Sequence, residues 1–455
     1  MLPEKFLQRM AIQLQNELPV FEEALQQPAP VSIRVNAEKI FASLPYEKVP
    51  WCDSAYYLKN RPAFIFDPLW HAGAYYVQEA SSMLIATAFK QLFPQPEKLN
   101  VLDLCAAPGG KSTLLLSLLP NDSLLVANEV IASRNSLLRE NITRWGKANI
   151  VVTQNDPRDF QKVHQFFDCI LIDAPCSGEG LFRKEPEAVN EWNEANLQLC
   201  EARQQRIVEE VLPALKPNGY IIYSTCTYNP KENEQQVASF VKKYQLKTVT
   251  IQFKESWGVV EDEAFGLHCL PHKVKGEGFF MAVMQKTSED DTQTFKVKNK
   301  LNILSEKERS SLDTLLHEAE QYEWIDFQEK KYFFPMKKIN DFNILLQSLH
   351  VKMFGVCGVQ IKNHNLIPQP ELAFATAFKK SSYPCLELTQ ENALKFLRKD
   401  VFEIENYVQG WAVVTFKNIP LGFVKINGSR INNYYAVNFR IRKTLETDLF
   451  WSISG

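Results

Sequence analysis

The chain has 455 residues, of which 45% are hydrophobic and 23% are charged. That composition is typical of globular protein and excludes a collagen, a coiled coil or a largely disordered chain. No stretch approaches the roughly 18 unbroken apolar residues of a membrane helix, and the start of the chain lacks the apolar core of a signal peptide. We therefore expect a soluble, cytoplasmic protein of about three domains, since a domain averages roughly 150 residues.

The formal net charge of −2 conceals an uneven distribution of charge along the chain. From residue 295 to the end there are 22 Lys and Arg against 17 Asp and Glu, whereas the preceding part has 29 against 36. A basic excess in one part of a chain is a sign that this part binds a polyanion, because phosphate contacts draw on Lys and Arg. Two ordinary solvated surfaces that differ in charge explain the distribution equally well.

The nine cysteines form no C-x-x-C pair, and their odd number argues against a disulfide framework. The segment from His268 to His272, which includes Cys269, comes nearest to a cluster of metal ligands. A zinc site would need a second ligand pair at a suitable spacing, and none lies nearby. We therefore expect no metal and a structural role for this segment.

The first 286 residues divide into two regions. Prolines punctuate the short segments of residues 1–95, and residues 96–286 alternate apolar runs with helical patterns. Such alternation is typical of a parallel α/β sheet. The expected strands cover residues 100–105, 124–128, 149–153, 168–172, 219–224 and 278–284, and the clearest helices cover residues 131–145 and 193–215.

The remaining residues form an extension with two expected domains. Thr287 to Thr294 is polar and acidic, so we expect a linker there. In the domain expected at 295–370, a helix is predicted from Ser305 to Glu323, with Ser305 as its cap and Glu308 three residues on. The domain expected at 371–455 contains strand-like runs separated by Gly and Asn turns from Tyr407 to Phe439, which predict a small β-rich fold.

A Gly-rich turn after the first expected strand is the candidate cofactor site. The turn consists of Cys105, Ala106, Ala107, Pro108, Gly109, Gly110 and Lys111. Such a turn lets a ligand approach the backbone and the N–H groups of the following helix. A phosphate-binding loop would need glycine where Cys105 stands, and the G-x-G-x-x-G pattern is absent. The turn therefore favours a nucleoside cofactor without a pyrophosphate, of which S-adenosylmethionine is the common one.

Two acidic residues at later strand ends support this interpretation. Glu129 ends the second strand, where a carboxylate can accept hydrogen bonds from ribose hydroxyls. Asp156 follows the third strand and can bind the amino group of adenine. A single acid at a strand end is more often a loop cap. The cofactor roles of Glu129 and Asp156 are therefore expected only because both acids follow the Gly-rich turn in chain order.

Two thiols and an aspartate follow the fourth and fifth expected strands. Asp173-Ala-Pro-Cys176 and Thr-Cys226-Thr end neighbouring strands, whose carboxyl ends meet at one edge of an open sheet. Carbon 5 of a pyrimidine is a weak nucleophile until a thiolate adds to carbon 6. That chemistry needs a thiolate, an acid near ring nitrogen 3 and a base, roles that Cys226, Asp173 and Cys176 can supply.

These motifs resemble those of the Sun-type family of RNA cytosine carbon-5 methyltransferases, which act on ribosomal and transfer RNA. The resemblance covers residues 30–286. The matching segments are 32–36, 73–82, 105–111, 173–178, 183–187 with Trp192, 224–228, 268–272 and 276–280.

The resemblance implies a class I, Rossmann-like, doubly wound methyltransferase sheet preceded by an N-terminal RNA-binding region. It implies that Cys226 is the nucleophile and that Cys176 helps to resolve the adduct. Asp173 would be an acid shared by the cofactor and the target base. Glu129 would bind the ribose and Asp156 the adenine of S-adenosylmethionine, while the Gly-rich turn and its lysine contact the cofactor.

The C-terminal extension is similar to that of bacterial family members acting on 16S ribosomal RNA, which end in a PUA-like RNA-binding domain. The matching candidate is the segment from Leu421 to Lys443. It carries no acid and five basic residues, namely Lys425, Arg430, Arg440, Arg442 and Lys443. Three aromatic residues among these charges, Tyr434, Tyr435 and Phe439, would suit stacking on unpaired bases, although an ordinary β-domain core also explains them.

We therefore expect a monomeric enzyme that methylates carbon 5 of cytosine in 16S ribosomal RNA, free or in the small ribosomal subunit. It would use S-adenosylmethionine and a covalent cysteine–RNA intermediate. One alternative is the same chemistry on transfer RNA. A DNA cytosine methyltransferase is another, in which Cys176 would be the nucleophile and Cys226 would have no role. A third is a non-catalytic RNA-binding or ribosome-assembly factor.

Overall fold

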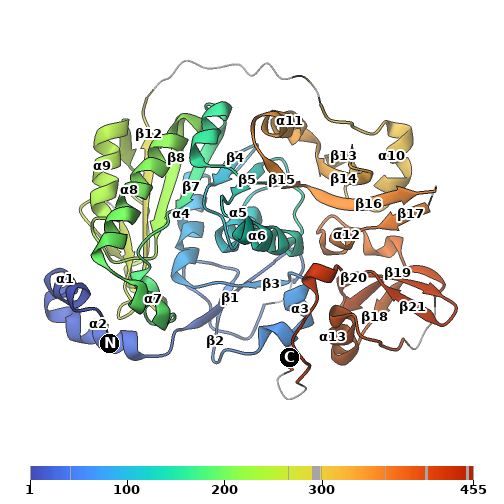
Figure 1. The fold of residues 1–455 in the computed structure, drawn as a ribbon, viewed down its shortest axis with the longest axis horizontal. Coiled ribbons are helices and arrows are strands. Elements are labelled where there is room, and N and C mark those ends of the chain that lie inside the picture. Colours follow the sequence, from blue (N-terminus) through green and yellow to red (C-terminus); the bar gives the residue numbers. More distant parts are fainter. Residues whose placement is uncertain are drawn as a thin grey trace.

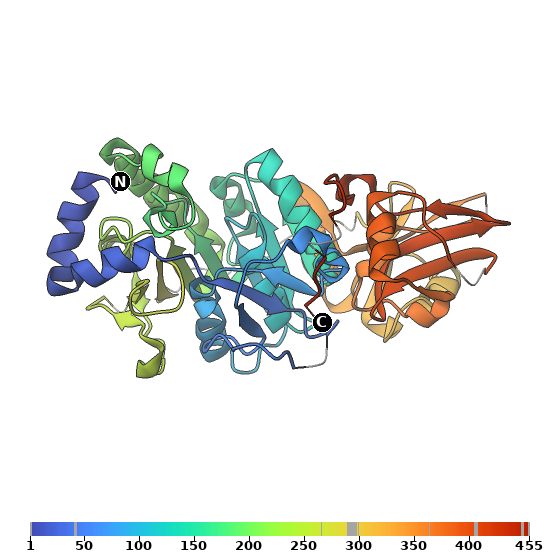
Figure 2. The ribbon, with the colours of Figure 1, turned by 90° about the horizontal axis from the view of Figure 1, so that it is seen from below.

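The computed structural model describes residues 2–40, 43–264, 266–288, 298, 300–363, 365–404, 408–446 and 450–453. The expected linker from Thr287 to Thr294 lies mostly outside these described residues. Figure 2 shows an elongated molecule with the N-terminal helices at one end, the large sheet in the middle and the C-terminal sheets at the other end. No helix in the described ranges is both long and apolar enough to cross a membrane.

The N-terminal region combines two helices with a small sheet. Helices α1 (Glu4–Leu14) and α2 (Leu18–Gln26) bury Phe6 and Phe21 against Phe182 and Tyr228, which flank the candidate active site. The antiparallel sheet has the order β2-β1-β3. Its strands are β1 (Val31–Val35), β2 (Ala55–Leu58) and β3 (Tyr75–Val77). Helix α3 (Pro68–His71) lies between β2 and β3, and α4 (Ile85–Leu92) follows β3.

The central sheet has the strand order β10-β11-β12-β8-β7-β4-β5-β6-β15, with β9 paired to β12. The strands are β4 (Asn100–Asp103), β5 (Leu124–Asn128), β6 (Ile150–Thr153), β7 (Phe167–Asp173), β8 (Leu215–Thr225), β9 (Leu246–Thr248), β10 (Val260–Glu261), β11 (Leu267–Cys269), β12 (Phe279–Lys286) and β15 (Val351–Phe354). Strands β4 to β8 are parallel, and β12 and β15 are antiparallel to their neighbours. This arrangement confirms the predicted α/β class.

Helices cover both faces of the central sheet (Figure 1). On one face, α4, α5 (Gly110–Leu118) and α6 (Ala132–Trp145) bury Phe89, Leu114 and Leu138. On the other face, α8 (Glu194–Val211) and α9 (Glu234–Tyr244) bury Val208 and Phe240. The short helix α7 (Pro186–Glu191) precedes α8. Because the strand order runs in opposite directions from β4 and from β7, a crevice is expected at their carboxyl ends.

The C-terminal part contains two four-stranded sheets, with the orders β13-β14-β16-β17 and β18-β19-β20-β21. The elements are α10 (Glu306–Asp313), β13 (Tyr322–Phe327), β14 (Lys330–Pro335), α11 (Ile339–Ser348), β16 (Val356–Lys362), β17 (Asn365–Pro368), α12 (Pro370–Phe374), β18 (Cys385–Glu387), α13 (Gln390–Arg398), β19 (Gly410–Phe416), β20 (Ile419–Asn427) and β21 (Arg430–Asn433). The predicted β-rich fold is present.

The helix predicted from Ser305 to Glu323 is shorter than expected. Glu308 accepts a hydrogen bond from the backbone N–H of Ser305 at 2.8 Å, as a cap should, but α10 ends at Asp313. A strand begins at Tyr322 because Tyr322 and Trp324 alternate with less buried residues and pack in the sheet. The predicted helix was too long because its apolar residues belong partly to α10 and partly to β13.

A strand from beyond the expected linker joins the central sheet. In β15, Phe354 pairs with Val151 of β6, so the C-terminal part supplies one edge of the central sheet. The Phe354 ring packs against Phe342 of α11 at 4.5 Å between centroids. The sequence pattern gives no sign of this connection.

Candidate active site

The Gly-rich turn connects β4 to α5 at the carboxyl edge of the sheet. Gly109 has a φ of 112°, a conformation that disfavours residues with a Cβ atom, and a Cβ there would lie 3.3 Å from Leu138. The turn lines a cavity of about 180 Å³ together with Tyr76 and Gln78 of the N-terminal region. A ligand in this cavity would meet the exposed backbone of the turn and the first turn of α5.

Arg34 of β1 supports this turn from behind, a role that no motif in the sequence indicates. Its guanidinium is fully buried and donates to Gln78 Oε1 at 3.0 Å and to Thr113 Oγ1 at 2.6 Å. It also donates to the carbonyl oxygen of Gly110 at 3.3 Å. Burial lowers the pKa of Arg34 to about 10, which leaves the side chain charged at neutral pH.

Glu129 lies beside the turn as the sequence predicts. It is buried directly after β5, and its carboxylate lies 3.4 Å from Arg134. Arg134 in turn donates to the carbonyl oxygen of Ala107, which ties the acid to the turn. One more acid was missed: Asp103 at the end of β4 is fully buried, with Oδ2 accepting from Ser112 at 2.6 Å and Oδ1 without a partner. Burial raises the pKa of Asp103 to about 7.

Asp156 follows β6 at the same edge of the sheet but faces helix α8. Its carboxylate caps the next turn by accepting from the N–H of Arg158, and it lies 3.2 Å from Arg206 of α8. The first contact is that of a loop cap, and the second is an ion pair with another element. Binding of adenine by Asp156 stays a prediction.

Asp173 connects the turn to the strand that bears the cysteine Cys226. Its Oδ2 lies 2.8 Å from Lys111 Nζ, and its Oδ1 accepts from Ser224 Oγ at 2.9 Å. Although burial lowers the pKa of Lys111, the charge of Asp173 and its hydrogen bond outweigh that effect and raise it. The ion pair thus joins the two sequence motifs that were predicted to meet.

The two predicted cysteines lie in contact. Cys176 Sγ is 3.2 Å from Cys226 Sγ and accepts a hydrogen bond from the N–H of Cys226 at 3.4 Å. The hydrogen bond to Cys226, together with burial, raises the pKa of Cys176 well above its ordinary value. Burial also raises the pKa of Cys105 in the Gly-rich turn, so the Cys105 thiol is a poor nucleophile. The pair can hold one thiol protonated beside a reactive sulfur.

The family models that match the chain cover its three regions. The description "16S rRNA methyltransferase RsmB/F" matches residues 89–285, "N-terminal domain of 16S rRNA methyltransferase RsmF" matches residues 2–80, and "Methyltransferase RsmF PUA domain" matches residues 383–441. A relative from Klebsiella pneumoniae named ribosomal RNA small subunit methyltransferase F is 34% identical, and the alignment covers 95% of each chain. The chain belongs to the RsmF family of rRNA methyltransferases. A Shewanella loihica relative with the same name is 30% identical over 95% of this chain and 94% of its own.

Two solved structures have a similar fold over part of the chain. A methyltransferase homolog protein from Pyrococcus horikoshii is 28% identical, with a TM-score of 0.51, over 59% of this chain and 90% of that one. NSun6 from Pyrococcus horikoshii, solved with SFG, has a TM-score of 0.53 over 63% of this chain and 99% of that one. At 20% identity the second likeness shows the fold alone. The resemblance noted in the sequence is confirmed, and so is the PUA domain at the C-terminus.

As a member of the RsmF family the chain is a methyltransferase that uses S-adenosylmethionine, and the residues of the site fit this cofactor. The cavity beside the Gly-rich turn exposes backbone atoms and Lys111 rather than a cluster of cations, which suits a nucleoside without phosphates. Asp103 places an unpartnered buried oxygen at the end of β4, next to the turn. Family membership also speaks against the non-catalytic alternative.

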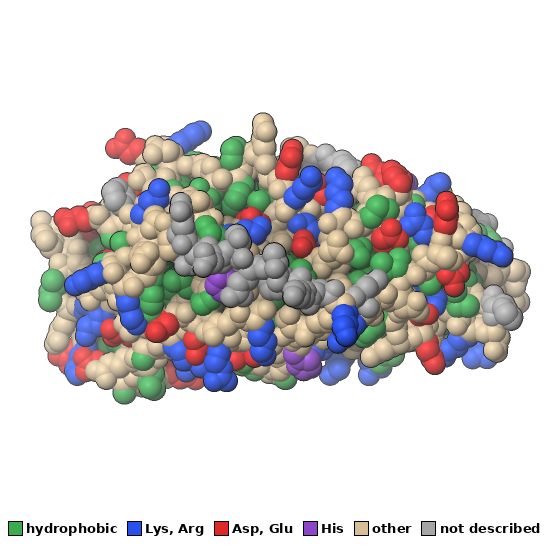
Figure 3. Space-filling view, turned by 90° about the horizontal axis from the view of Figure 1, so that it is seen from above, with side chains coloured by type: hydrophobic (Ala, Val, Ile, Leu, Met, Phe, Trp, Pro, Cys, Tyr) green, Lys and Arg blue, Asp and Glu red, His purple; other side chains and the backbone are tan. Residues whose placement is uncertain are grey.

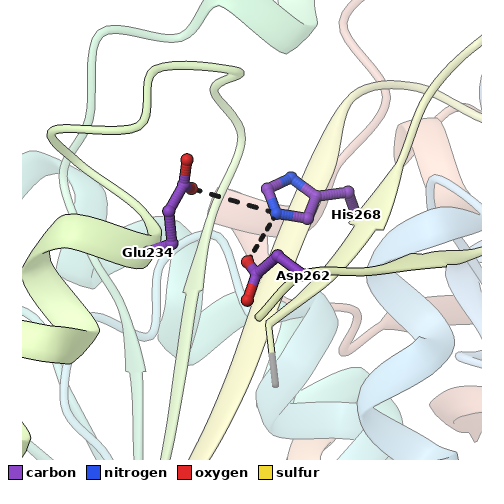
Figure 4. A group of neighbouring side chains, drawn as sticks. All are labelled: Glu234, Asp262 and His268. Atoms are coloured by element: carbon purple, nitrogen blue, oxygen red, sulfur yellow. Dashed lines mark hydrogen bonds and ion pairs between the residues drawn. The ribbon is translucent and has the colours of Figure 1, made fainter. Parts of the chain in front are cut away.

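The segment from His268 to His272 contributes to a different cluster (Figure 4). His268 Nε2 lies 2.8 Å from Asp262 Oδ2 and 3.9 Å from Glu234 Oε2. Asp262 Oδ1 also accepts from the N–H groups of Ala264 and Gly266, as in a turn that is stabilised by its own side chain. His272 is engaged with Glu17 of the N-terminal region. These contacts connect loops and give both histidines structural partners.

The expectation that three tail aromatics stack on bases is wrong for two of them. Tyr435 and Phe439 are buried in a core with Phe374 and Phe396, because their side chains point toward the sheet and not toward solvent. Tyr434 remains 37% exposed and packs on Trp411 at 4.4 Å between centroids. The local charge pattern does not show which face of the segment carries each ring.

Proposed function

We propose that this methyltransferase transfers a methyl group to carbon 5 of cytosine in 16S ribosomal RNA through a covalent cysteine–RNA intermediate. The observation that carries the proposal is the contact between Cys176 and Cys226, at 3.2 Å, beside the Asp173–Lys111 ion pair. Methylation of an exocyclic amino group would need no thiol. Two thiols in contact at the ends of parallel strands suit addition to a pyrimidine and its reversal.

The reaction begins at Cys226 in this proposal. Its thiolate adds to carbon 6 of the cytosine, and the ring electrons move to carbon 5 while nitrogen 3 gains hydrogen-bond donation or a proton. Asp173 lies between the Gly-rich turn and the Cys226 strand, so it is placed to share a proton with ring nitrogen 3. S-adenosylmethionine would supply the electrophilic methyl group: a bond forms from carbon 5 to the methyl carbon as the S–CH3 bond breaks, and S-adenosylhomocysteine is the leaving group.

Release of the product requires Cys176 in this proposal. After methyl transfer, carbon 5 carries both a methyl group and a hydrogen. Loss of that hydrogen as a proton returns an electron pair to the ring and expels Cys226 from carbon 6. Cys176 lies next to the leaving sulfur, and its thiolate, formed by loss of its own proton to solvent, accepts the proton from carbon 5. The two thiols therefore divide attack and release between them.

The cofactor would lie along the Gly-rich turn. Residues Cys105 to Lys111 would contact it with backbone groups, Glu129 would accept from the ribose hydroxyls and Asp156 would accept from the adenine amino group. Asp173 would contact both the cofactor and the base. Lys111, held by Asp173, would keep that carboxylate oriented.

The choice of RNA depends on the relatives and on the C-terminal part. The relatives are named for the small ribosomal subunit, and the RsmF PUA model matches residues 383–441. On one face of the molecule, basic and acidic side chains are interspersed (Figure 3), so RNA affinity would depend on shape and local patches. Lys425 is one basic residue of the C-terminal part, and its Nζ lies 5.5 Å from the ring centroid of Trp411.

Two cysteine variants test the chemistry. With Cys226→Ala we expect no methylation but unchanged binding of S-adenosylmethionine in calorimetry. With Cys176→Ala we expect a protein–RNA adduct that survives a denaturing gel, because attack proceeds and release does not. Full turnover by Cys226→Ala would refute the mechanism, and an exchange of the two phenotypes would favour the order of events proposed for DNA cytosine methyltransferases.

Bisulfite sequencing of RNA from a deletion strain tests the substrate. We expect one or more methylated cytosines of 16S ribosomal RNA to become unmethylated while transfer RNA is unaffected. Loss confined to transfer RNA would overturn the choice of substrate. Purified enzyme assayed on free 16S RNA and on assembled small subunits then identifies the form that it modifies.

A further inference from the structure

Glu232 is a fully buried carboxylate behind the two cysteines, and no step above uses it. It lies six residues after Cys226, just before α9. Its Oε1 accepts from the N–H of Ser177 at 2.9 Å, and its Oε2 accepts from the hydroxyl of the same residue at 2.6 Å. Because Ser177 directly follows Cys176, both carboxylate oxygens bind the loop that carries the first thiol.

The same serine hydroxyl also contacts the loop of the second thiol. Ser177 Oγ lies 2.7 Å from Thr227 Oγ1, and Thr227 directly follows Cys226. A path of short hydrogen bonds therefore runs from Glu232 through Ser177 to Thr227. The residues bound in this way are the immediate neighbours of Cys176 and Cys226.

Two further donors hold the carboxylate itself in place. Gln204 of α8 donates to Oε1 at 3.2 Å, and Asn229 donates to Oε2 at 3.3 Å. Gln204 also donates to the carbonyl oxygen of Pro175, so α8 is connected to the Cys176 loop as well. Four donors on one buried carboxylate form a rigid arrangement, because the loss of any one leaves a buried polar atom without its partner. Burial raises the pKa of Glu232, and these hydrogen bonds oppose that effect.

We propose that Glu232 is a positioning residue that bridges the Cys176 and Cys226 loops through Ser177 and Thr227 and so keeps the two thiols in contact. The inference deepens the proposed function and rests on it for the consequence, since release of the RNA adduct needs Cys176 beside Cys226. A displacement of about 1 Å in a reacting group can slow a reaction by roughly 100-fold. Loss of the Glu232 bridge should therefore lower kcat and KM together, because release follows methyl transfer.

A chemical test of the thiol contact needs neither RNA nor the proposed function. Diamide removes two electrons and two protons from a pair of thiols in contact, which form a disulfide while the reagent is reduced to its hydrazine. Mass spectrometry of peptides containing Cys176 and Cys226 follows the rate of this linkage in the full chain. We expect at least a roughly tenfold slower rate for Glu232→Ala and a smaller decrease for Glu232→Gln, whose amide can still accept from the N–H of Ser177.

Glu234→Ala serves as the matched control. It removes the same side chain two residues along the segment, from a position that faces His268. Its rate of linkage should equal that of the wild type. A wild-type rate in Glu232→Ala, or equal slowing in both variants, would overturn the inference. Should Glu232→Ala fail to fold, Ser177→Ala tests the same bridge, because it removes only the hydroxyl between Glu232 and Thr227.

A second measurement connects the bridge to catalysis. In single-turnover assays with RNA and S-adenosylmethionine, we expect Glu232→Ala to accumulate the covalent adduct. In steady-state assays kcat should fall about 10- to 100-fold and KM should fall with it, because the slowed release follows methyl transfer. Slow thiol linkage combined with normal turnover would overturn the catalytic consequence. Activity of Cys226→Ala would instead refute the proposed function, and the diamide result would still decide whether Glu232 sets the thiol contact.

Discussion

Replacement of Arg34 by methionine tests how the N-terminal region supports the cofactor turn. Methionine fills a similar volume but removes every donor of the buried guanidinium. Of the acceptors, the carbonyl oxygens of Gly110 and Thr113 keep another donor, whereas Gln78 Oε1 loses its donor Arg34 Nε. Gln78 lines the cofactor cavity, so the loss of its partner occurs beside the site of S-adenosylmethionine.

The expected cost follows from these contacts. A buried acceptor left without a partner costs about 1–3 kcal/mol, and loss of the cation–π contact with Trp145, whose ring centroid lies 4.5 Å from the Arg34 Cζ atom, costs about 1 kcal/mol more. Removal of the buried charge offsets part of this cost, so the net loss of stability is roughly 2–3 kcal/mol. We expect S-adenosylmethionine affinity in calorimetry to fall about 5- to 10-fold, and the thermal midpoint to fall by several degrees.

Two control variants complete the test. Arg34→Lys keeps the charge but lacks the planar fork, so it should recover little of the affinity. Arg61→Met makes the same change at an exposed position of the same region and should bind S-adenosylmethionine like the wild type. Wild-type affinity and stability in Arg34→Met would show that the guanidinium does not support the turn.

Four further predictions concern the turn, its buried acid and the tail. Gly109→Ala places a Cβ in a backbone conformation with a φ of 112° and should weaken S-adenosylmethionine binding about tenfold in calorimetry; equal affinity would contradict the close approach. Because burial raises the pKa of Asp103 from 3.8 to about 7, its ionisation destabilises the fold as pH rises from 4 to 7, so Asp103→Asn should gain thermal stability over the wild type more at pH 8 than at pH 5. A constant difference between the two pH values would refute that assignment. Tyr435→Ala should cost about 3–5 kcal/mol of stability in denaturant unfolding and Tyr434→Ala little, because only Tyr435 is buried. Lys425→Ala should reduce the salt dependence of RNA binding by about one charge in a filter-binding titration, and an unchanged slope would remove Lys425 from the RNA contact.

The site residues that sequence reasoning could place are those that follow strands. Asp173 and Cys226 lie next to each other because β7 and β8 are parallel neighbours, and the Gly-rich turn reaches them because β4 is the other neighbour of β7. Strand order in an open α/β sheet thus converts short motifs into one edge of the structure. The same reasoning places Glu129 correctly beside the turn.

The residues that were missed or misjudged depend on side chains that approach from other elements. Arg34 reaches α5 from a separate sheet, and Glu232 receives donors from α8 and two loops. Asp156 is held by Arg206 of α8, which a strand-end pattern cannot reveal. A pattern of charges likewise could not separate buried Tyr435 from exposed Tyr434, because adjacent residues point in opposite directions.

Strand β15 has a consequence for dissecting this protein. It covers the backbone of β6, which without it would be the terminal strand of the parallel sheet and would present unpaired N–H and C=O groups to other chains. A truncated protein that stops after residue 288 therefore retains Cys176, Cys226 and the cofactor turn but exposes an unpaired edge strand, which is prone to aggregation. During synthesis the edge of β6 stays unpaired until residues 351–354 have been made. The catalytic sheet is therefore completed only after more than three quarters of the chain has been synthesised.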